Sequence, residues 1–148
     1  MITKEGYPFI IVLLILTVVI RIIGQIAELS ILMDCAVISG LLLLFCLNFF
    51  RDPKRKIPKG KGIFVSPADG KIVQIKSVDD PDIGKANLVS IFLNVFNVHV
   101  NRTPVGGSIS EVQHKKGKFL AAFNHSASDE NEQSNIHIHS TEGLIKVK

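Results

Sequence analysis

A histidine flanked by two amides occupies the middle of residues 97–101, where polar and apolar residues alternate strictly. In a strand, this alternation would place the two valines toward a core and Asn97, His99 and Asn101 together on the opposite face. Histidine side chains exchange protons near neutral pH, and the guanidinium of Arg102 could grip a carboxylate or a phosphate. The pattern therefore indicates a proton-transfer and anion-binding cluster, although a polar strand face without a chemical role would show the same alternation.

Asp69 lies in a Pro-Ala-Asp-Gly sequence, where a carboxylate could act in acid–base chemistry. Aspartate is also favoured in turns for a structural reason, because its carboxylate accepts hydrogen bonds from nearby backbone N–H groups. His137 and His139 stand two residues apart on one face of a possible strand, and this spacing can bind a metal ion. No third ligand is evident nearby in the sequence, so we expect no metal site.

Strands must position these residues, because the sequence after Lys61 consists of short β-like runs separated by Gly, Pro, Asn and Asp. The expected runs are residues 63–65, 71–78, 88–100, 108–114, 136–140 and 144–148. The first two should pair across the Pro-Ala-Asp-Gly turn, and the last two across residues 141–143. Residues 79–87 and 124–134 are polar and are expected to be loops. The predicted fold class is mainly β, as a sandwich or a partly closed barrel.

The first fifty residues differ in character, because two long apolar runs fill them and they contain five charged residues. The runs cover about residues 9–26 and 35–50, close to the lower limit of about 18 residues for a membrane-spanning helix. Polar residues at 27–34 would form a turn at the far interface. We therefore predict an N-terminal transmembrane helical hairpin. A shallow re-entrant hairpin is the alternative, because Arg21 interrupts the first run.

Six basic residues and one acidic residue lie between residues 51 and 61, whereas residues 62–148 hold nine of each sign. This local excess does not resemble a nucleic-acid-binding face. It is typical of a topology signal, and it would also attract anionic lipid by about 1 kcal/mol per basic residue. With Lys4 before the first run, the positive-inside rule places the β domain on the cytoplasmic face of the cell membrane. The chain thus divides into an anchor (1–50), a basic linker (51–61) and a β-rich domain (62–148).

Several motifs occur together in the order and spacing of one known family. They are Phe49-Phe50-Arg51-Asp52-Pro53, Ser66-Pro67-Ala68-Asp69-Gly70, Phe96-Asn97-Val98-His99-Val100-Asn101-Arg102-Thr103-Pro104, Gly117-Lys118-Phe119 and Ala127-Ser128-Asp129-Glu130-Asn131-Glu132. Each motif is weak alone. The ordered set, which runs from about Asn48 to the end, resembles the short-form phosphatidylserine decarboxylase proenzymes.

The resemblance implies an enzyme made as an inactive precursor that cuts itself between a glycine and a serine near its C-terminus. The serine becomes a covalently bound pyruvoyl group, which forms a Schiff base with the serine headgroup and draws electrons while carbon dioxide leaves. The product is the ethanolamine lipid, and no metal is needed. The implied partners are a membrane phospholipid, either phosphatidylserine or archaetidylserine, and the small pyruvoyl-bearing subunit of the same precursor. A homo-oligomer is also compatible with the family.

By the same resemblance, Asp69 would help a histidine to activate the serine for self-cleavage, and His99 would transfer protons during processing or decarboxylation. From their chemistry, Asn101 and Arg102 are candidates for holding the substrate carboxylate or phosphate. The sequence departs from the family at Gln133, where an arginine is usual. It also departs at residues 125–128, where the family tends to have Lys-Ala-Ser.

The family's cleavage motif is not found in this chain, because Gly107-Ser108 lies where the family has an ordinary strand connection. We therefore expect the pyruvoyl serine to lie beyond Lys148. The present chain would then be either a truncated precursor or a larger subunit without its final strands. This chain alone is expected not to decarboxylate. The rival interpretations are a lipoyl- or biotinyl-like carrier domain and a lipid-binding adaptor. A carrier displays a lysine in a hairpin, usually beside a methionine, and the methionines here are Met1 and Met33.

Overall fold

The computed structural model describes residues 1–121 and 127–148. It contains two compact units, which we describe separately. One unit consists of Met1–Lys56 together with Leu93–Val100, and the other of Ile57–Phe92 together with Asn101–Lys148. Each unit is therefore assembled from segments that are far apart in the chain.

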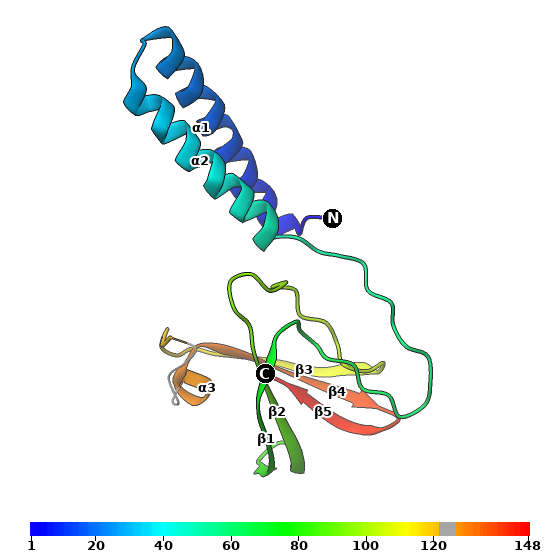
Figure 1. Cartoon of the computed structure of the whole chain (residues 1–148). Coiled ribbons are helices and arrows are strands. Elements are labelled where there is room, and N and C mark those ends of the chain that lie inside the picture. Colours follow the sequence, from blue (N-terminus) through cyan, green and yellow to red (C-terminus); the bar gives the residue numbers. More distant parts are fainter. Residues whose placement is uncertain (122–126) are drawn as a thin grey trace. The chain divides into compact units, whose positions relative to one another are not determined.

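Two long helices form a hairpin in the first unit (Figure 1). Its elements are η1 (Lys4–Gly6), α1 (Tyr7–Ile26) and α2 (Ser30–Phe49). Small and hydroxyl-bearing residues let the helices approach closely. A Cβ at Gly24 would lie 2.8 Å from the Cβ of Leu32, and the hydroxyl oxygens of Thr17 and Ser39 are 2.7 Å apart. The predicted pair of apolar helices is confirmed, and the turn between them is shorter than the predicted 27–34.

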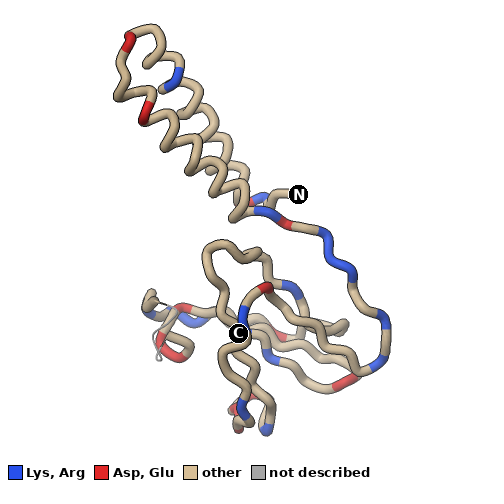
Figure 2. Tube along the Cα trace, in the orientation of Figure 1, with Lys and Arg blue, Asp and Glu red and all other residues tan. Residues whose placement is uncertain are grey.

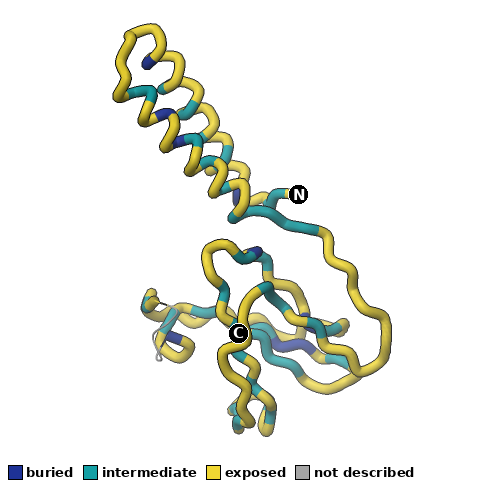
Figure 3. Tube along the Cα trace, viewed as in Figure 1, coloured by how far each residue is buried: buried dark blue, intermediate teal, exposed yellow. Residues whose placement is uncertain are grey.

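Most residues of both helices are exposed, as the colouring of the hairpin in Figure 3 shows. Ile15 on α1 is 58% exposed, and Val37 and Leu44 on α2 are each 62% exposed. A continuous apolar surface of this kind is rare on a protein that lies in water. By length and composition, both helices are able to cross a membrane.

Backbone hydrogen bonds close the base of the hairpin. The Thr3 N–H donates to the Phe50 carbonyl at 2.9 Å, and the Asp52 N–H donates to the Met1 carbonyl at 2.6 Å. The rings of Phe9 and Phe50 stack beside these bonds, with their centroids 5.6 Å apart. Lys and Arg residues then follow one another along the extended segment after α2 (Figure 2).

In the described part of the second unit, five strands form two antiparallel sheets (Figure 1). The elements are β1 (Lys71–Asp80), β2 (Gly84–Phe92), β3 (Ser108–Lys115), α3 (Ala127–Glu130), β4 (Gln133–Ser140) and β5 (Gly143–Val147). β1 pairs with β2, and the other sheet has the order β3–β4–β5. The predicted β character and the hairpin across residues 141–142 are confirmed. The predicted loop at 124–134 lies partly outside the described residues, and α3 and the start of β4 occupy much of the remainder.

The predicted strand at residues 63–65 is wrong, as is its pairing with the next strand. The segment is not a strand, and the Val65 N–H donates instead to the Pro104 carbonyl at 2.9 Å. β1 pairs along its whole length with β2. A three-residue run offers few ladder hydrogen bonds, so it competes poorly with a nine-residue strand for the same partner.

The predicted loop at residues 79–87 is wrong for most of its length, because only residues 81–83 form a turn and the others belong to β1 and β2. β1 continues to Asp80, whose Oδ1 accepts hydrogen bonds from the backbone N–H groups of Asp82 (2.9 Å) and Ile83 (3.3 Å). Gly84 follows with a φ of +74°, which glycine adopts without strain. An aspartate-stabilised turn thus joins β1 directly to β2.

The hydrophobic core of the second unit is small. Among its described residues, the buried hydrophobic side chains are Ile138 (1% exposed) and Ala127 (8% exposed). Large aliphatic side chains on both sheets stay exposed, such as Ile75 on β1 and Val112 on β3. Polar contacts therefore contribute a larger share of the stability of this unit than they do in a domain with a large hydrophobic core. The sandwich or barrel arrangement stays a prediction.

Candidate functional site

The loop that carries His99 (Leu93–Val100) is not part of a strand, so the strand predicted for residues 88–100 is too long. Asparagine side chains bond to the backbone directly after β2. Asn97 Oδ1 accepts from the Asn94 N–H at 2.9 Å, and Asn94 Oδ1 accepts from the N–H two residues further on at 2.8 Å. Such local bonds compete with a sheet ladder, so the chain turns here in spite of its β-like composition.

His99 is exposed, and two contacts hold its ring. Its Nδ1 lies 3.0 Å from the Asn97 carbonyl oxygen, and since a carbonyl only accepts hydrogen bonds, Nδ1 carries the proton. In the neutral ring, the lone pair on Nε2 is then able to accept a proton, as a general base requires. The ring also stacks on Phe49, the last residue of α2, with centroids 4.3 Å apart and 23° between the planes. The predicted alternation survives in part, because Val98 is buried and His99 is exposed.

Two further side chains connect this loop to the end of α2. Arg51 donates through Nη1 to the Asn48 carbonyl at 2.6 Å and through Nη2 to the Phe96 carbonyl at 2.7 Å. Phe45 meets the ring of Phe96 edge to face, with centroids 6.4 Å apart. The His99 loop and the end of α2 therefore form one packed structure within the first unit.

Asp69 lies half-buried in the turn of residues 67–70, within the second unit. The Arg102 N–H donates to the Pro67 carbonyl at 2.8 Å, so the backbone at Arg102 adjoins this turn. Asn101 and Arg102 are exposed. The structure thus brings Arg102 to the Asp69 turn. His99 belongs to the other unit, whose second segment ends directly before Asn101.

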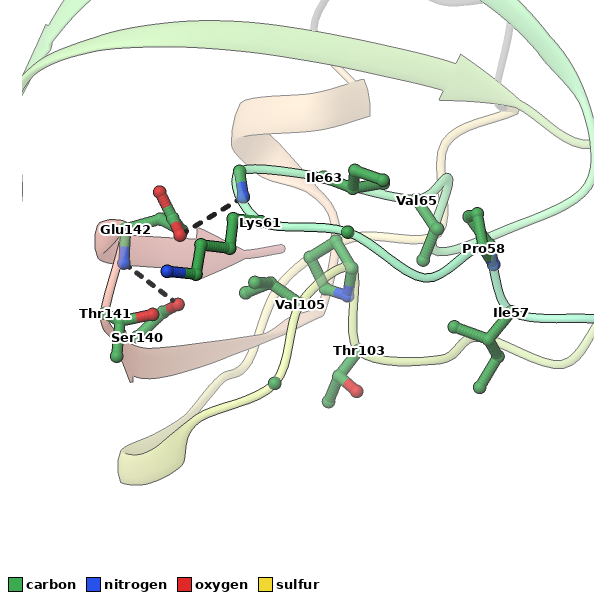
Figure 4. A pocket seen from close by; sticks show the side chains of 14 residues that line it. Ile57, Pro58, Lys61, Ile63, Val65, Thr103, Val105, Ser140, Thr141 and Glu142 are labelled. Carbon is green, nitrogen blue, oxygen red and sulfur yellow. Dashed lines mark hydrogen bonds between the residues drawn. The ribbon is translucent and has the colours of Figure 1, made fainter.

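A pocket of about 530 Å³ lies in the second unit, next to Arg102 in sequence (Figure 4). Its lining residues are Ile57, Pro58, Gly60, Lys61, Gly62, Ile63, Val65, Thr103, Pro104, Val105, Gly106, Ser140, Thr141 and Glu142. Lys61 and Glu142 supply opposite charges, and Glu142 Oε1 accepts a hydrogen bond from the Gly62 N–H at 3.2 Å. The mixture of charges, hydroxyl groups and aliphatic side chains suits a polar headgroup better than a purely apolar molecule. Sequence reasoning missed the pocket because three separate segments line it.

A partly buried ionic cluster joins β1 and the turn after it to the other sheet. The side chain of His137 is 8% exposed, with Nδ1 3.1 Å from Glu111 Oε2 and Nε2 3.5 Å from Asp82 Oδ2. On the neighbouring strand, Lys146 Nζ lies 2.6 Å from Asp82 Oδ2 and 3.0 Å from Asp80 Oδ2. Sequence reasoning missed this cluster as well, because its members come from four strands and one turn.

The two histidines considered as a metal-binding pair have different surroundings. His139 is exposed, whereas His137 is buried between carboxylates. Within residues 1–121 and 127–148, no group of three His, Cys, Asp or Glu side chains has the arrangement of a metal site. His137 therefore serves the ionic cluster.

The cluster changes the titration of its members. Hydrogen bonds to Asp82 and then to Asp80 raise the pKa of Lys146, against the opposing effect of burial. Burial alone would raise the pKa of Asp80, but the Asp82 N–H and the Lys146 ammonium together lower it. Hydrogen bonds from Gln113 and from His137 lower the pKa of Glu111. These groups are therefore held in their charged forms near neutral pH, which suits a structural link better than proton transfer.

Comparisons with known proteins agree with the motifs. A family model described as phosphatidylserine decarboxylase matches residues 42–148. A phosphatidylserine decarboxylase proenzyme of Chlorobaculum tepidum is 50% identical over 104 residues, which cover 70% of this chain and 48% of the relative. Proteins of the same name from Nitratidesulfovibrio vulgaris and Wolbachia pipientis are 43% and 42% identical, and each covers 96% of this chain. No solved structure matches the chain.

The chain spans between about half and two-thirds of the length of these relatives, with 63% and 61% for the latter two. The matched region contains all four predicted site residues, Asp69, His99, Asn101 and Arg102. It also contains the end of α2, whose side chains contact the His99 loop. The family model covers well over half of the chain, which therefore belongs to the phosphatidylserine decarboxylase family.

Proposed function

We propose that the full protein removes the carboxyl group of a serine phospholipid, and that this chain supplies its membrane anchor and its acid–base residues. In the reaction, the carboxylate leaves as carbon dioxide and a proton takes its place on the same carbon, which gives the ethanolamine lipid. The observation that carries the proposal is the arrangement of His99 in a chain of this family. Its Nδ1–H bonds to the Asn97 carbonyl, and its Nε2 is able to exchange a proton.

The other site residues receive roles that fit their surroundings. Asp69 is a half-buried carboxylate in a fixed turn, and we assign it to the activation of the serine for self-cleavage. Arg102 is an exposed residue whose backbone adjoins that turn, and we assign its guanidinium to bidentate binding of the substrate carboxylate or phosphate. Asn101, also exposed, would add an amide donor to the same anion.

The relatives are named proenzymes, and we propose that the mature protein carries a covalent pyruvoyl group made from a serine beyond Lys148. When present, this group supplies an electron sink for the loss of carbon dioxide. Self-cleavage needs a proton acceptor and a carboxylate, and we assign these roles to His99 and Asp69. The segment that bears the group would be the partner subunit from the same precursor.

The hairpin gives the proposed enzyme access to a lipid substrate. We propose that it spans the bilayer, with the anchor at residues 1–50, the basic linker at 51–61 and the catalytic part at 62–148. Basic residues on both sides of the hairpin support a cytoplasmic position for the catalytic part. The linker would concentrate anionic serine lipid near the site. The motifs concern only the headgroup, so both phosphatidylserine and archaetidylserine fit the proposal.

The proposal is tested in a precursor extended to the full length of its relatives and placed in phospholipid nanodiscs. In His99→Gln, we expect self-cleavage or the formation of ethanolamine lipid to fall by about 100-fold, as for loss of a general acid or base. Cleavage is measured on gels, and the lipid product by mass spectrometry. His139→Gln is the matched control, because His139 is also an exposed histidine but lies on β4. Normal processing and turnover in His99→Gln would disprove the assigned role.

A further inference from the structure

The end of α2 contacts the His99 loop more closely than an anchor requires. We propose that Phe49 and Arg51 are positioning residues, which orient the His99 imidazole so that Nε2 meets the substrate. The inference rests on the proton-transfer role proposed for His99. It adds that the last turn of the apolar hairpin determines the geometry of the site, beyond holding the protein at the membrane.

The two contacts of the His99 ring restrain different motions. Stacking on Phe49, with 4.3 Å between the centroids and 23° between the planes, sets the plane of the imidazole. The hydrogen bond from Nδ1 to the Asn97 carbonyl sets which edge of the ring faces the loop. An exposed histidine would otherwise sample several rotamers. Together, the two contacts give Nε2 one direction.

Arg51 holds the loop itself. Its two guanidinium nitrogens bond to the Asn48 carbonyl at the end of α2 and to the Phe96 carbonyl, three residues before His99. A planar guanidinium presents donors at a fixed separation and can bridge two acceptors, whereas the ammonium of a lysine lacks this fork. Arg51 thus links the Phe96 backbone, 45 residues later in the sequence, to the C-terminal end of α2.

These contacts are not needed to close the hairpin. The base of the hairpin already has the backbone bonds from Thr3 and Asp52 and the stacked rings of Phe9 and Phe50. Phe49 also touches the rings of its neighbours in sequence and along the helix, so its removal will disturb some local packing. Phe9→Leu is therefore a suitable control, because it removes an aromatic contact at the same end of the hairpin and leaves the His99 stack intact.

The first test observes His99 directly, without enzyme activity. In NMR spectra of the 148-residue chain in nanodiscs, we expect the ring protons of His99 to lie upfield of those of His139, because Phe49 shields them. Phe49→Leu should remove this difference, whereas Phe49→Tyr and Phe9→Leu should keep it. A His99 signal that does not change in Phe49→Leu would refute the stack.

The second test measures decarboxylation by the full-length protein. We expect Phe49→Leu and Arg51→Lys to lower kcat about 10- to 100-fold with little change in KM, since small misplacements of a reacting group have effects of this order. Phe49→Tyr should restore most of the rate, and Phe9→Leu should leave it unchanged. If Phe49→Leu fails to fold by circular dichroism, Arg51→Lys decides the outcome. Full kcat in Arg51→Lys and in a folded Phe49→Leu would refute positioning, whereas full activity in His99→Gln would refute the proposed function instead.

Discussion

Removal of the Lys146 charge should loosen the link between the two sheets. Lys146 Nζ lies 2.6 Å from Asp82 Oδ2 and 3.0 Å from Asp80 Oδ2, and its side chain is 13% exposed. Lys146→Met keeps most of the aliphatic stem but leaves two carboxylates close together without a cation. The perturbation therefore combines lost hydrogen bonds with like-charge repulsion.

The expected loss in the free energy of unfolding is about 2 kcal/mol. Breaking a fully buried ion pair costs about 3–5 kcal/mol, whereas an exposed pair is worth about 0–1 kcal/mol. The Asp80 side chain is 23% exposed and that of Asp82 is 37% exposed, so water screens part of the interaction. The loss in the free energy of unfolding should accordingly lie between the values for an exposed and for a fully buried ion pair.

The effect should depend on pH at both extremes. The lowered pKa of Asp80 means that its contribution is present above its unfolded pKa of about 3.9 and is lost as the pH falls through the folded value. The raised pKa of Lys146 means that its contribution is present below its unfolded pKa of about 10.4 and is lost as the pH rises through the folded value. The difference between wild type and Lys146→Met should thus shrink at acid pH, where Asp80 becomes protonated, and at strongly alkaline pH, where Lys146 loses its charge.

Hydrogen–deuterium exchange of the Asp82 and Ile83 amides reports this link locally, in the full chain in nanodiscs. A loss of about 2 kcal/mol corresponds to exchange about 30-fold faster at pH 7. Lys148→Met is the matched control, because Lys148 lies 3.6 Å from Asp129, whose side chain is 84% exposed. Equal exchange in the two variants at pH 7, or a difference that grows toward pH 3, would refute the reasoning.

Two more predictions concern the backbone at the site and the extent of the anchor. Gly70→Ala should lower stability by about 1–3 kcal/mol in urea unfolding, because Gly70 has a φ of +152° and a Cβ there would overlap the Phe92 carbonyl oxygen. Gly106→Ala should hardly change stability, since the space around its Cβ position is open. An equal loss of stability in Gly70→Ala and Gly106→Ala would contradict the predicted overlap with the Phe92 carbonyl. Deletion of residues 1–50 should leave the protection of the β4 amides from hydrogen–deuterium exchange unchanged but lower that of the Leu93–Val100 amides. Unchanged protection of Leu93–Val100 would show that α2 does not support this loop.

The parts of the fold that were predictable depend on local sequence. Two long, mainly apolar runs predicted the two helices, because short strands do not accommodate so many aliphatic side chains in sequence. The β4–β5 hairpin was predictable from clean alternation on both sides of Gly143, whose φ is +124°. The strand at 88–100 was predicted too long, because β propensity cannot show that Asn94 and Asn97 will bond to the backbone around them.

The ionic cluster could not be predicted, because it depends on long-range pairing. Glu111 and His137 meet through the register of β3 and β4, and His137 and Lys146 through that of β4 and β5. In the sequence, Glu111 and Lys146 resemble ordinary charges on solvated strand faces, and His137 pairs with His139 as a possible metal ligand. The same limit applies to the pocket beside Lys61 and Glu142, whose lining comes together only in the folded chain.

The candidate site shows why motifs can carry more information than their local patterns. In the sequence, Phe-Phe-Arg-Asp-Pro at residues 49–53 looks like the end of an apolar helix followed by a charged flank, and the His99 motif looks like a separate strand. In the structure, Phe49 stacks on His99, and Arg51 bonds to the Phe96 carbonyl. Two motifs of the family are therefore parts of one packed structure. The stack on His99 and the hydrogen bond to the Phe96 carbonyl are contacts with the loop and not with lipid, so we expect substitutions at Phe49 and Arg51 to affect the proton transfer proposed for His99 before they affect membrane attachment.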